Sequence, residues 1–314
     1  MPFTLIRGLH NLRPQHRGCV ATIGSFDGVH RGHRAIIDQL LVQAKALSLP
    51  SVVMIFEPQP YEFFSGEKAP ARLTPMREKV RALAACGVDR VICLQFNQAL
   101  RQLTAQAFIE QVLVEGLGIK SLVVGDDFRF GCDRTGDFAL LQQAGKQHGF
   151  SVYDTCTVEE GGERISSTRI RHALETEHFA EAECLLGHAY TVRGRVEYGR
   201  QLGRTIGVPT ANVRLRRYRS PLNGVFAVRM RLADSETWMP GVANVGVRPT
   251  VGHEIRPILE VYVLDFSGDL YRREVEVIFC KKLREERKFP SFDALKEQIY
   301  SDIAQAKQFF EMNS

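Results

Sequence analysis

Two histidines, His30 and His33, stand three residues apart in the stretch GSFDGVHRGH, which directly follows the apolar run CVATIG. The glycines at 24, 28 and 32 permit tight turns and a close approach of the backbone to a ligand. A helix that begins near Gly32 would point free N–H groups and a partial positive charge at that ligand. The stretch therefore predicts an anion site in which both imidazoles donate hydrogen bonds to phosphate oxygens.

Hydroxyl and guanidinium side chains gather in a second stretch, ISSTRIR, at residues 165–171. At the start of a helix, such side chains and the free N–H groups form another arrangement that holds anions. An ordinary Ser/Thr N-cap with solvated arginines is the alternative interpretation. Taken with the two histidines, the stretch favours one shared phosphate site.

The stretch GDDFRFG, at residues 125–131, ends an apolar run with two acids, two aromatic side chains and an arginine. Acids of this kind often form turns, and the two phenylalanines could equally belong to the core. The residues alone therefore leave a ligand-binding loop and an ordinary turn both open.

The C-terminal part of the chain carries a different candidate phosphate site. Its stretch GRQLGRTIGVPTAN supplies Gly199, Gly203 and Gly207, followed by Thr210 and Asn212. The common phosphate-binding motif G-x-x-x-x-G-K-[ST] does not occur in the sequence, because the only Gly-Lys pair is followed by glutamine. In an extended segment, residues two apart share a face. A hydroxyl and an amide oxygen on one face suit Mg²⁺ bound with nucleotide phosphates. A glycine-rich turn followed by an ordinary strand is the alternative.

Glu260 is the candidate acid of this second site. It belongs to ILEVYVLDF, at residues 258–266. Strand alternation separates the faces as follows: Leu259, Val261 and Val263 on one, and Ile258, Glu260, Tyr262 and Leu264 on the other. The carboxylate is thereby predicted to project among bulky apolar groups, where an acid either pairs with a cation or is functional.

Composition defines the broad class of protein. The 314 residues are 44% hydrophobic and 25% charged with a formal net charge of +5, which is typical of a globular protein and suits anionic small molecules as well as nucleic acid. No signal-peptide core and no membrane-spanning apolar run of about 20 residues occurs, so a cytoplasmic location is expected. The seven cysteines include no C-x-x-C pair, so neither a disulfide framework nor a thiolate zinc site is indicated.

The pattern of elements changes near residue 187. Before it, the short apolar runs CVATIG, SVVMIF, RVICLQF, SLVVGDDF and SVYDTCTV alternate with stretches of helical period, which predicts a parallel sheet covered by helices. After it, six runs with strand alternation precede a helix from about Ser291, which predicts a small antiparallel barrel and one closing helix. The first of these patterns places GSFDGVHRGH between a strand and a helix, where open α/β sheets bind ligands.

Several stretches, in order, resemble one family. GSFDGVHRGH looks like the H-x-G-H motif of the nucleotidyltransferase superfamily, and its F-D-G-V-H form is similar to the N-terminal module of prokaryotic bifunctional riboflavin kinase/FAD synthetases. The further stretches that resemble that family are FEPQP, VVGDDFRFG, ISSTRIR, GRTIGVPTANV, LEVYVLDF and KLREERKFPSFDALKEQI. The resemblance implies a Rossmann-like nucleotidyltransferase domain over 1–186 and a six-stranded β-barrel riboflavin kinase domain with a C-terminal helix over 187–314.

The resemblance also implies roles for individual residues. In the N-terminal module, flavin would lie by Pro58, Asp127 and Phe128. ATP phosphates would be held by Gly24, Asp27, His30, His33, Ser167, Thr168 and Arg171, with the two histidines catalytic. In the C-terminal module, the implied set is Gly199, Gly203 and Gly207 for ATP, Thr210 and Asn212 for Mg²⁺, Glu260 as catalytic base, and Arg284, Glu286 and Phe289 for flavin.

The implied function is the ATP-dependent phosphorylation of riboflavin to FMN, followed by adenylylation of FMN to FAD with release of pyrophosphate. Riboflavin, FMN, FAD and ATP are the expected small molecules, and both steps are expected to use Mg²⁺. No nucleic-acid or membrane partner is expected, and the protein could form a transient oligomer. Two alternatives stay open. In the first, the barrel binds nucleic acid through its arginine run RLRRYRS, at 214–220, with an affinity that depends strongly on salt concentration. In the second, only one of the two modules is an active enzyme.

Overall fold

The structure, a computed structural model, describes residues 3–125, 127–132, 134–155, 157–199, 207–215, 217–249 and 255–313. Within that part of the chain, the fold divides into two compact units. The first comprises the residues up to Pro70 and Met76–Ser166, and the second comprises Ala71–Pro75 and the chain from Ser167 onward. Each unit has its own sheet and its own buried core.

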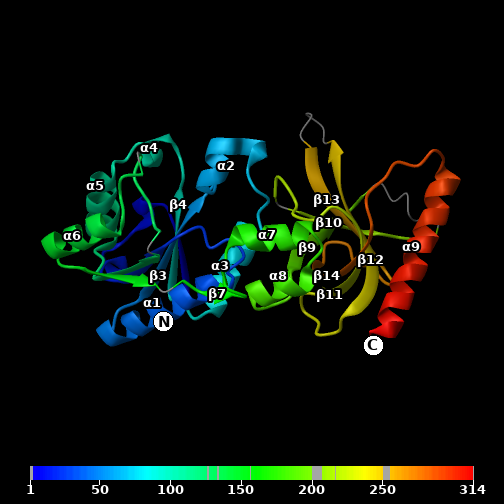
Figure 1. The fold of residues 1–314 in the computed structure, drawn as a ribbon, viewed down its shortest axis with the longest axis horizontal. Coiled ribbons are helices and arrows are strands. Elements are labelled where there is room, and N and C mark those ends of the chain that lie inside the picture. Colours follow the sequence, from blue (N-terminus) through cyan, green and yellow to red (C-terminus); the bar gives the residue numbers. More distant parts are fainter. Residues whose placement is uncertain are drawn as a thin grey trace. The chain divides into compact units, whose positions relative to one another are not determined.

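The first unit is built on a parallel sheet with six strands among the described residues (Figure 1). In order across the sheet, the strands are β1 (Thr4–Arg7), β4 (Arg90–Gln95), β3 (Ser51–Glu57), β2 (Val20–Ile23), β5 (Ser121–Gly125) and β6 (Ser151–Thr155). The predicted parallel sheet is confirmed. The strand β1 was not predicted, and it pairs with β4 at the edge of the sheet.

Helices cover both faces of this sheet. The helices of this unit among the described residues are η1 (Leu9–Asn11), η2 (Pro14–His16), α1 (Arg31–Leu47), α2 (Pro60–Ser65), η3 (Gly66–Lys68), α3 (Met76–Ala85), α4 (Gln98–Arg101), α5 (Ala105–Phe108), the π-helix η4 (Ile109–Leu117) and α6 (Phe138–His148). The two faces of the sheet are covered mainly by α1 and α3 on one side and by α5, η4 and α6 on the other. A short hairpin, β7 (Glu159–Glu160) with β8 (Glu163–Arg164), follows the sheet. The stretch with helical period after GSFDGVHRGH is therefore α1, as predicted.

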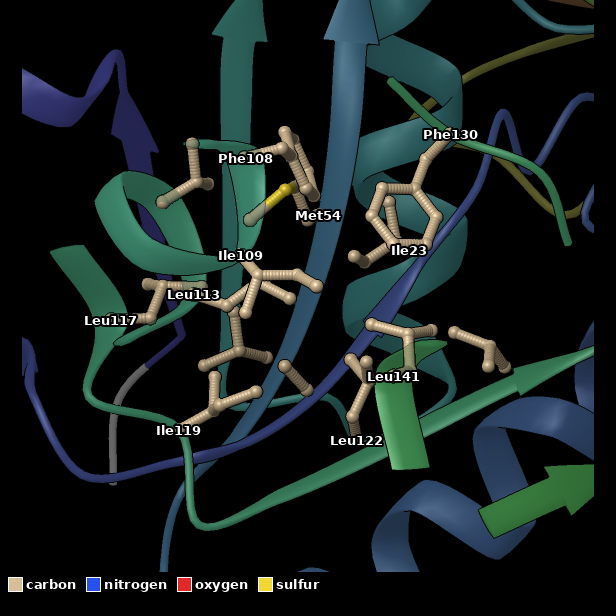
Figure 2. Close-up of a cluster of buried hydrophobic side chains, with 14 of the residues drawn as sticks. Ile23, Met54, Phe108, Ile109, Leu113, Leu117, Ile119, Leu122, Phe130 and Leu141 are labelled. Carbon is tan, nitrogen blue, oxygen red and sulfur yellow. The ribbon is translucent and has the colours of Figure 1, made fainter. Parts of the chain in front are cut away.

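The strands read as continuous apolar runs because successive residues enter two different cores. On one face, Met54 of β3 meets Phe108 and Ile109 from α5 and η4, as Figure 2 shows. On the other face, Val53 of the same strand meets Leu40 of α1. Burial on both faces leaves no polar face on the central strands, so the only solvent-facing parts of the sheet are its edges and its ends.

The second unit is a closed antiparallel barrel with six strands in the described part of the chain (Figure 1). Around the barrel, the strands are β10 (Ala211–Arg214), β13 (Ile255–Val263), β12 (Met239–Pro249), β11 (Gly224–Leu232), β14 (Glu274–Arg284) and β9 (Thr191–Glu197). All six follow from the predicted runs. Closure removes the exposed strand edges that an open sheet of this size would leave.

Three helices belong to the barrel unit: α7 (Ser167–Glu175), α8 (Phe179–Leu186) and α9 (Phe292–Met312). The closing helix α9 begins after Ser291, whose hydroxyl accepts a hydrogen bond from the Ala294 N–H. Its Ala306 and Phe310 form a buried cluster with Ala227 and Leu264 of the barrel unit. Figure 1 shows α9 alongside the barrel. None of the helices in the described ranges is both long enough and apolar enough to cross a membrane.

The compact units divide about twenty residues before the predicted boundary at 186/187. The reason is that α7 and α8 pack with the barrel. The Phe179 ring stands edge-on to Phe226, with 6.2 Å between centroids, and the Glu177 carboxylate lies 3.0 Å from Lys282 Nζ. Whether residues 187–314 suffice for function stays a prediction.

The division makes a testable prediction about two fragments, 167–314 and 187–314. The shorter fragment lacks Leu185 and Leu186, which are fully buried, and lacks the Phe179 contact with Phe226. We expect its free energy of unfolding to be lower by at least about 3 kcal/mol, the cost of removing one large buried side chain. Urea unfolding followed by fluorescence of Trp238, the single tryptophan, measures the difference. Equal stability of the two fragments would show that α7 and α8 contribute nothing to the barrel.

Candidate functional site

The candidate site of the first unit lies where the strand order of the sheet reverses. From β2 the chain moves to β3 and β4 on one side, and β5 and β6 occupy the other side of β2. In open α/β sheets, ligands bind at such a switch point, outside the carboxyl ends of the strands. The stretch GSFDGVHRGH directly follows β2, whereas FEPQP and GDDFRFG begin at the ends of β3 and β5 and continue beyond them. Three of the predicted motifs therefore meet at one edge of the sheet.

The loop after β2, residues 24–30, has an unusual backbone. Phe26 and Val29 adopt φ values of 46° and 42°, a left-handed conformation that costs a non-glycine residue about 1 to 3 kcal/mol. Both side chains are only 1% exposed and belong to the core that α1 covers. Burying each apolar side chain contributes about 1.5 to 3 kcal/mol, which offsets the cost of the backbone. Gly28, at φ 89°, provides the remaining left-handed residue.

His30 and His33 are brought together as predicted. Their rings stack with 3.6 Å between centroids and 18° between planes. His30 is the N-cap of α1, and its Nδ1 accepts a hydrogen bond from the His33 N–H at 3.3 Å. In the same loop, Asp27 is buried. The paired imidazoles thus occupy the N-terminus of a 17-residue helix, where the helix dipole favours an anion.

His33 is held in its neutral form. Burial lowers the pKa of its imidazole well below the usual value, and the charges of His30, Lys79 and Arg164 lower it further. His33 Nδ1 is fully enclosed and makes no hydrogen bond within the part of the chain that the structure describes. A neutral imidazole carries one N–H, so in this form His33 can donate one hydrogen bond to an anion.

Two ion pairs tie the hairpin β7–β8 to this edge of the sheet. Arg31 Nη1 lies 2.5 Å from Glu160 Oε2, and Arg164 Nη1 lies 2.5 Å from Asp127 Oδ2. The hydrogen bond from Arg164 holds the pKa of the Asp127 carboxyl below its ordinary value. Asp127 was predicted to contact flavin, and in this structure its carboxylate is paired with Arg164. Because both pairs are substantially exposed, they contribute little to stability.

The predicted flavin residues Pro58 and Phe128 follow β3 and β5. The Phe128 ring stacks on Phe130 at 5.5 Å between centroids, so it is attached to the core on one side. After Pro58, the helix α2 carries Tyr61 and Phe64, which are both exposed aromatic side chains. Exposed aromatic surface near a sheet switch point suits a planar ligand ring.

The stretch ISSTRIR spans the end of the first unit and the start of the second. Ser167 and Thr168 lie in the first turn of α7, and the Arg171 Nε donates to the Ala71 carbonyl at 2.5 Å. These residues belong to the second unit, whereas His30 and His33 belong to the first. The shared phosphate site predicted from the two motifs stays a prediction.

The barrel carries its candidate site as a polar row on the outer face. Glu260 pairs directly with Asn212 on one neighbouring strand and with Asn244 on the other, and Asn212 pairs in turn with Glu197. Directly paired residues of antiparallel strands point to the same face. The predicted apolar neighbours of Glu260 on its own strand are thus joined by two amides on the neighbouring strands. Asn244 was missed, since alternation along one strand does not show its neighbours.

The glycine-rich segment approaches this row closely. A methyl group at Gly199 would collide with the Asn212 amide, which would then have to move. Gly207 adopts φ 75°, which also favours glycine, and Gly203 lies outside the described residues. Thr210, just before β10, is among the residues that line a pocket of about 700 Å³. The rest of its lining is largely apolar and aromatic: Val196, Tyr198, Val261, Val263, Phe266, Leu270 and Tyr271.

The predicted flavin residues of the barrel differ in how they are engaged. The Arg284 guanidinium donates to both carboxylate oxygens of Asp302, at 2.8 to 3.1 Å, and so fixes β14 to α9. The Glu286 carboxylate lies against Gly246, where a methyl group would strike it. The Phe289 ring faces the Arg284 guanidinium at 5.5 Å. Asp302, only 2% exposed, was missed because helical periodicity predicts an apolar residue at its position.

The arginine run RLRRYRS does not form one exposed basic face in the described residues. Arg214 pairs with Glu197 at 3.0 Å. Arg217 is buried and donates to the Tyr190 hydroxyl at 2.7 Å and to the Arg72 carbonyl. At least two of its charges are thus used within the protein rather than offered to a polyanion. No cluster of three or more His, Cys, Asp or Glu side chains suited to a metal occurs in the described ranges.

Comparison with known proteins agrees with a chain of two parts, an α/β unit followed by a barrel. The FAD synthetase family model matches residues 12–169, and the riboflavin kinase family model matches residues 186–310. These two classes of transferase are joined in single chains. The bifunctional riboflavin kinase/FMN adenylyltransferase of Pseudomonas fluorescens is 56% identical to this chain, over 96% of each. The protein of that name from Escherichia coli strain K12 is 55% identical, over 98% of this chain and 97% of its own.

The chain therefore belongs to the family of bifunctional riboflavin kinases/FMN adenylyltransferases. Among solved structures, a crystal structure described as a macrolide-efflux protein from Streptococcus pneumoniae is 30% identical with a TM-score of 0.77. The match covers 97% of this chain and 99% of that one.

The neutral state of His33 makes a prediction about stability and pH. The unfolded chain binds a proton at this imidazole near pH 6.5, whereas the folded chain binds it only at lower pH. Below about pH 6.5 the unfolded state therefore binds more protons, and the free energy of unfolding falls as pH decreases. We expect His33→Gln to lose less stability than the natural chain between pH 7 and pH 5, as measured by urea unfolding and circular dichroism. His148→Gln, at an exposed position of the same unit, is the matched control. Parallel stability curves for the natural chain and His33→Gln would contradict the assignment.

Proposed function

We propose that the first unit transfers the adenylyl group of ATP to FMN and that the barrel unit phosphorylates riboflavin with ATP. The observation that carries this proposal is that the motifs of each activity lie at a separate site, one at the sheet switch point and one on the polar row. Riboflavin kinase produces FMN, which is the acceptor of the adenylyl step. One chain would thus convert riboflavin to FAD.

In adenylyl transfer, a phosphate oxygen of FMN attacks the α-phosphorus of ATP. The new P–O bond forms as the bond between the α-phosphorus and its bridging oxygen breaks, and pyrophosphate leaves with the electron pair. Two anions must approach each other, so positioned donors supply most of the catalysis. We assign the α1 N-terminus, His30 and His33 to the phosphates of ATP, with Gly24 and Asp27 in the same loop. Ser167, Thr168 and Arg171 complete the proposed set.

For flavin in the adenylyl step, we propose the edge formed by Pro58, Asp127 and Phe128. Phe128 is held by its stack on Phe130, so it offers a fixed surface to a planar ring. Asp127 would exchange its ion pair with Arg164 for the ligand, which costs little because the pair is exposed.

In the kinase step, the riboflavin 5′-hydroxyl attacks the γ-phosphorus of ATP, and ADP leaves. We assign Glu260 as the base that accepts the hydroxyl proton. Asn212 and Asn244 are its direct neighbours on the adjoining strands, and neutral amides leave the charge of the carboxylate in place. Arg284, Glu286 and Phe289 are the proposed flavin contacts, with the Arg284 side chain already fixed by Asp302.

Mg²⁺ fits the residues beside Glu260. Thr210 and Asn212 offer hard oxygen donors, and because residue 199 is glycine the Asn212 amide can lie close to the backbone there. Bound there, Mg²⁺ neutralises charge on the ATP phosphates. We propose that the 700 Å³ pocket beyond Thr210 accepts the nucleobase of ATP, because its aromatic lining suits a flat ring and its position next to Thr210 leads to the phosphates. Gly199, Gly203 and Gly207 would then allow the phosphates close to the backbone.

All proposed ligands are small molecules, so we expect a cytoplasmic enzyme that needs neither nucleic acid nor a membrane. A transient oligomer is compatible with either site. The direct test is to incubate the protein with riboflavin, ATP and Mg²⁺ and to separate the flavins by chromatography. FMN and FAD should both form, and absence of both would refute the proposal.

The two histidines make the next prediction. Because they are proposed to hold the ATP phosphates only at the switch point, replacing both His30 and His33 by Ala should stop FAD formation from FMN, while riboflavin is still phosphorylated. The kinase rate in the same variant serves as the control for folding of the barrel. FAD synthesis near the natural rate in the double variant would remove the histidines from the mechanism.

Glu260 and Asn212 make distinguishable predictions. Glu260→Gln keeps shape while removing the base, so kcat for FMN formation should fall by roughly 10²- to 10⁴-fold with riboflavin still bound. Asn212→Ala removes a proposed Mg²⁺ ligand, so raising Mg²⁺ should recover part of its lost activity. Steady-state kinetics at several Mg²⁺ concentrations measures both effects.

The matched control is Glu197→Gln, which removes a carboxylate from the same row but one that pairs with Arg214. It should keep kinase activity. FAD synthesis from supplied FMN should stay normal in all three variants. Equal rescue of Glu260→Gln and Asn212→Ala by Mg²⁺ would contradict the division of roles.

A further inference from the structure

Lys79, on α3, carries a buried charge that the proposed mechanism has not used. Its side chain is 1% exposed, although lysine is almost never fully buried unless its ammonium group is bound by other groups. Removing a charge from water is costly, and a buried lysine that served only packing could be replaced by an aliphatic residue. None of the motifs in the sequence contains Lys79.

The ammonium group of Lys79 is directed at the loop that carries the two histidines. Its Nζ donates to the Ser25 carbonyl at 2.5 Å. Ser25 directly precedes Phe26, the first of the left-handed residues in this loop. A hydrogen bond from a charged donor is among the stronger ones in proteins, so it restrains the backbone at the point where the unusual conformation begins.

A second observation places the Lys79 charge close to the imidazole pair. The positive charge of Lys79 is one of the causes that lower the pKa of His33, after burial and the charge of His30, and together with that of Arg164. Electrostatic effects of this kind require proximity. The same ammonium group thus contacts the start of the loop and acts on the histidine at its end.

We propose that Lys79 is a positioning residue for adenylyl transfer, which fixes the loop 24–30 through the Ser25 carbonyl so that His30 and His33 face the ATP phosphates. The inference rests on the proposed function of this unit. It assigns α3, which contributes no motif, a defined part in the reaction. Small displacements of positioned groups reduce the rate strongly, because the catalysis depends on placing donors before the reaction begins.

The test uses the full chain with Lys79→Met, which keeps length and apolar bulk but has no donor. We expect kcat for FAD formation from FMN to fall about 10- to 100-fold, the ratio that a hydrogen bond to a charged group corresponds to. KM for ATP should change less than 3-fold, because the loss falls on the geometry of the reacting complex. Riboflavin phosphorylation by the barrel should be unchanged and reports on folding of the second unit.

The matched control is Arg77→Met, which removes a positive charge from an exposed position two residues earlier on the same helix. It should leave kcat for FAD formation within 2-fold of the natural chain. Lys79→Gln is the second variant, since its amide can still donate to Ser25 while the charge is gone. It should recover part of the lost kcat.

A readout independent of activity is the titration of His33 by ¹⁵N NMR, with its signal identified by comparison with His33→Gln. The pKa of His33 should rise in Lys79→Met and Lys79→Gln and stay unchanged in Arg77→Met. If Lys79→Met does not fold, the same measurements on Lys79→Gln decide. Natural kcat together with an unchanged His33 titration would overturn the inference. Failure of the natural chain to make FAD would instead refute the proposed function, and the titration would still test the contact.

Discussion

The first site depends on a backbone conformation that the loop could not keep by itself. Phe26 and Val29 are left-handed, and although the Val29 N–H donates a hydrogen bond to the Phe26 carbonyl at 3.4 Å, each conformation costs about 1 to 3 kcal/mol. The core compensates it, because both side chains are buried against α1 and α3. The turn that directs His30 into the N-cap is therefore a consequence of how the sheet and its helices pack. Loosening that core would misplace the imidazoles before it unfolded the unit.

The barrel site depends on a different constraint, the register of four strands. Glu197, Asn212, Glu260 and Asn244 come from separate strands and meet only because direct pairing aligns them. A shift by one residue in any strand would send its polar side chain into the barrel interior. The buried residues between them, such as Val213, Leu259 and Val245, oppose such a shift, since each would have to leave the core. The hydrophobic interior thus fixes the polar chemistry on the outside.

Much of this architecture could be predicted from the sequence, because the elements that are buried on one or both faces have strong patterns. All six barrel strands, the central strands of the sheet and α1 were predicted, whereas β1 was missed because it is short and lies at an edge. Contacts between distant residues were beyond prediction. Nothing near Glu260 in the sequence indicates Asn244, and nothing near Arg284 indicates Asp302. The packing of α7 and α8 with the barrel was also beyond prediction, since pattern alone cannot assign their apolar faces to a partner.

Both units hold a proposed functional segment with one buried charge from a residue that lies outside every motif. In the first unit, the ammonium group of Lys79 binds the backbone at the start of the histidine loop. In the second, the carboxylate of Asp302 binds the Arg284 guanidinium at the start of the segment that carries Phe289. A charge-assisted bond costs desolvation but is directional, whereas an apolar contact of similar strength would let the segment slide. Directionality is what a site for phosphate chemistry requires, because its donors must be in place before the charges of the reaction develop.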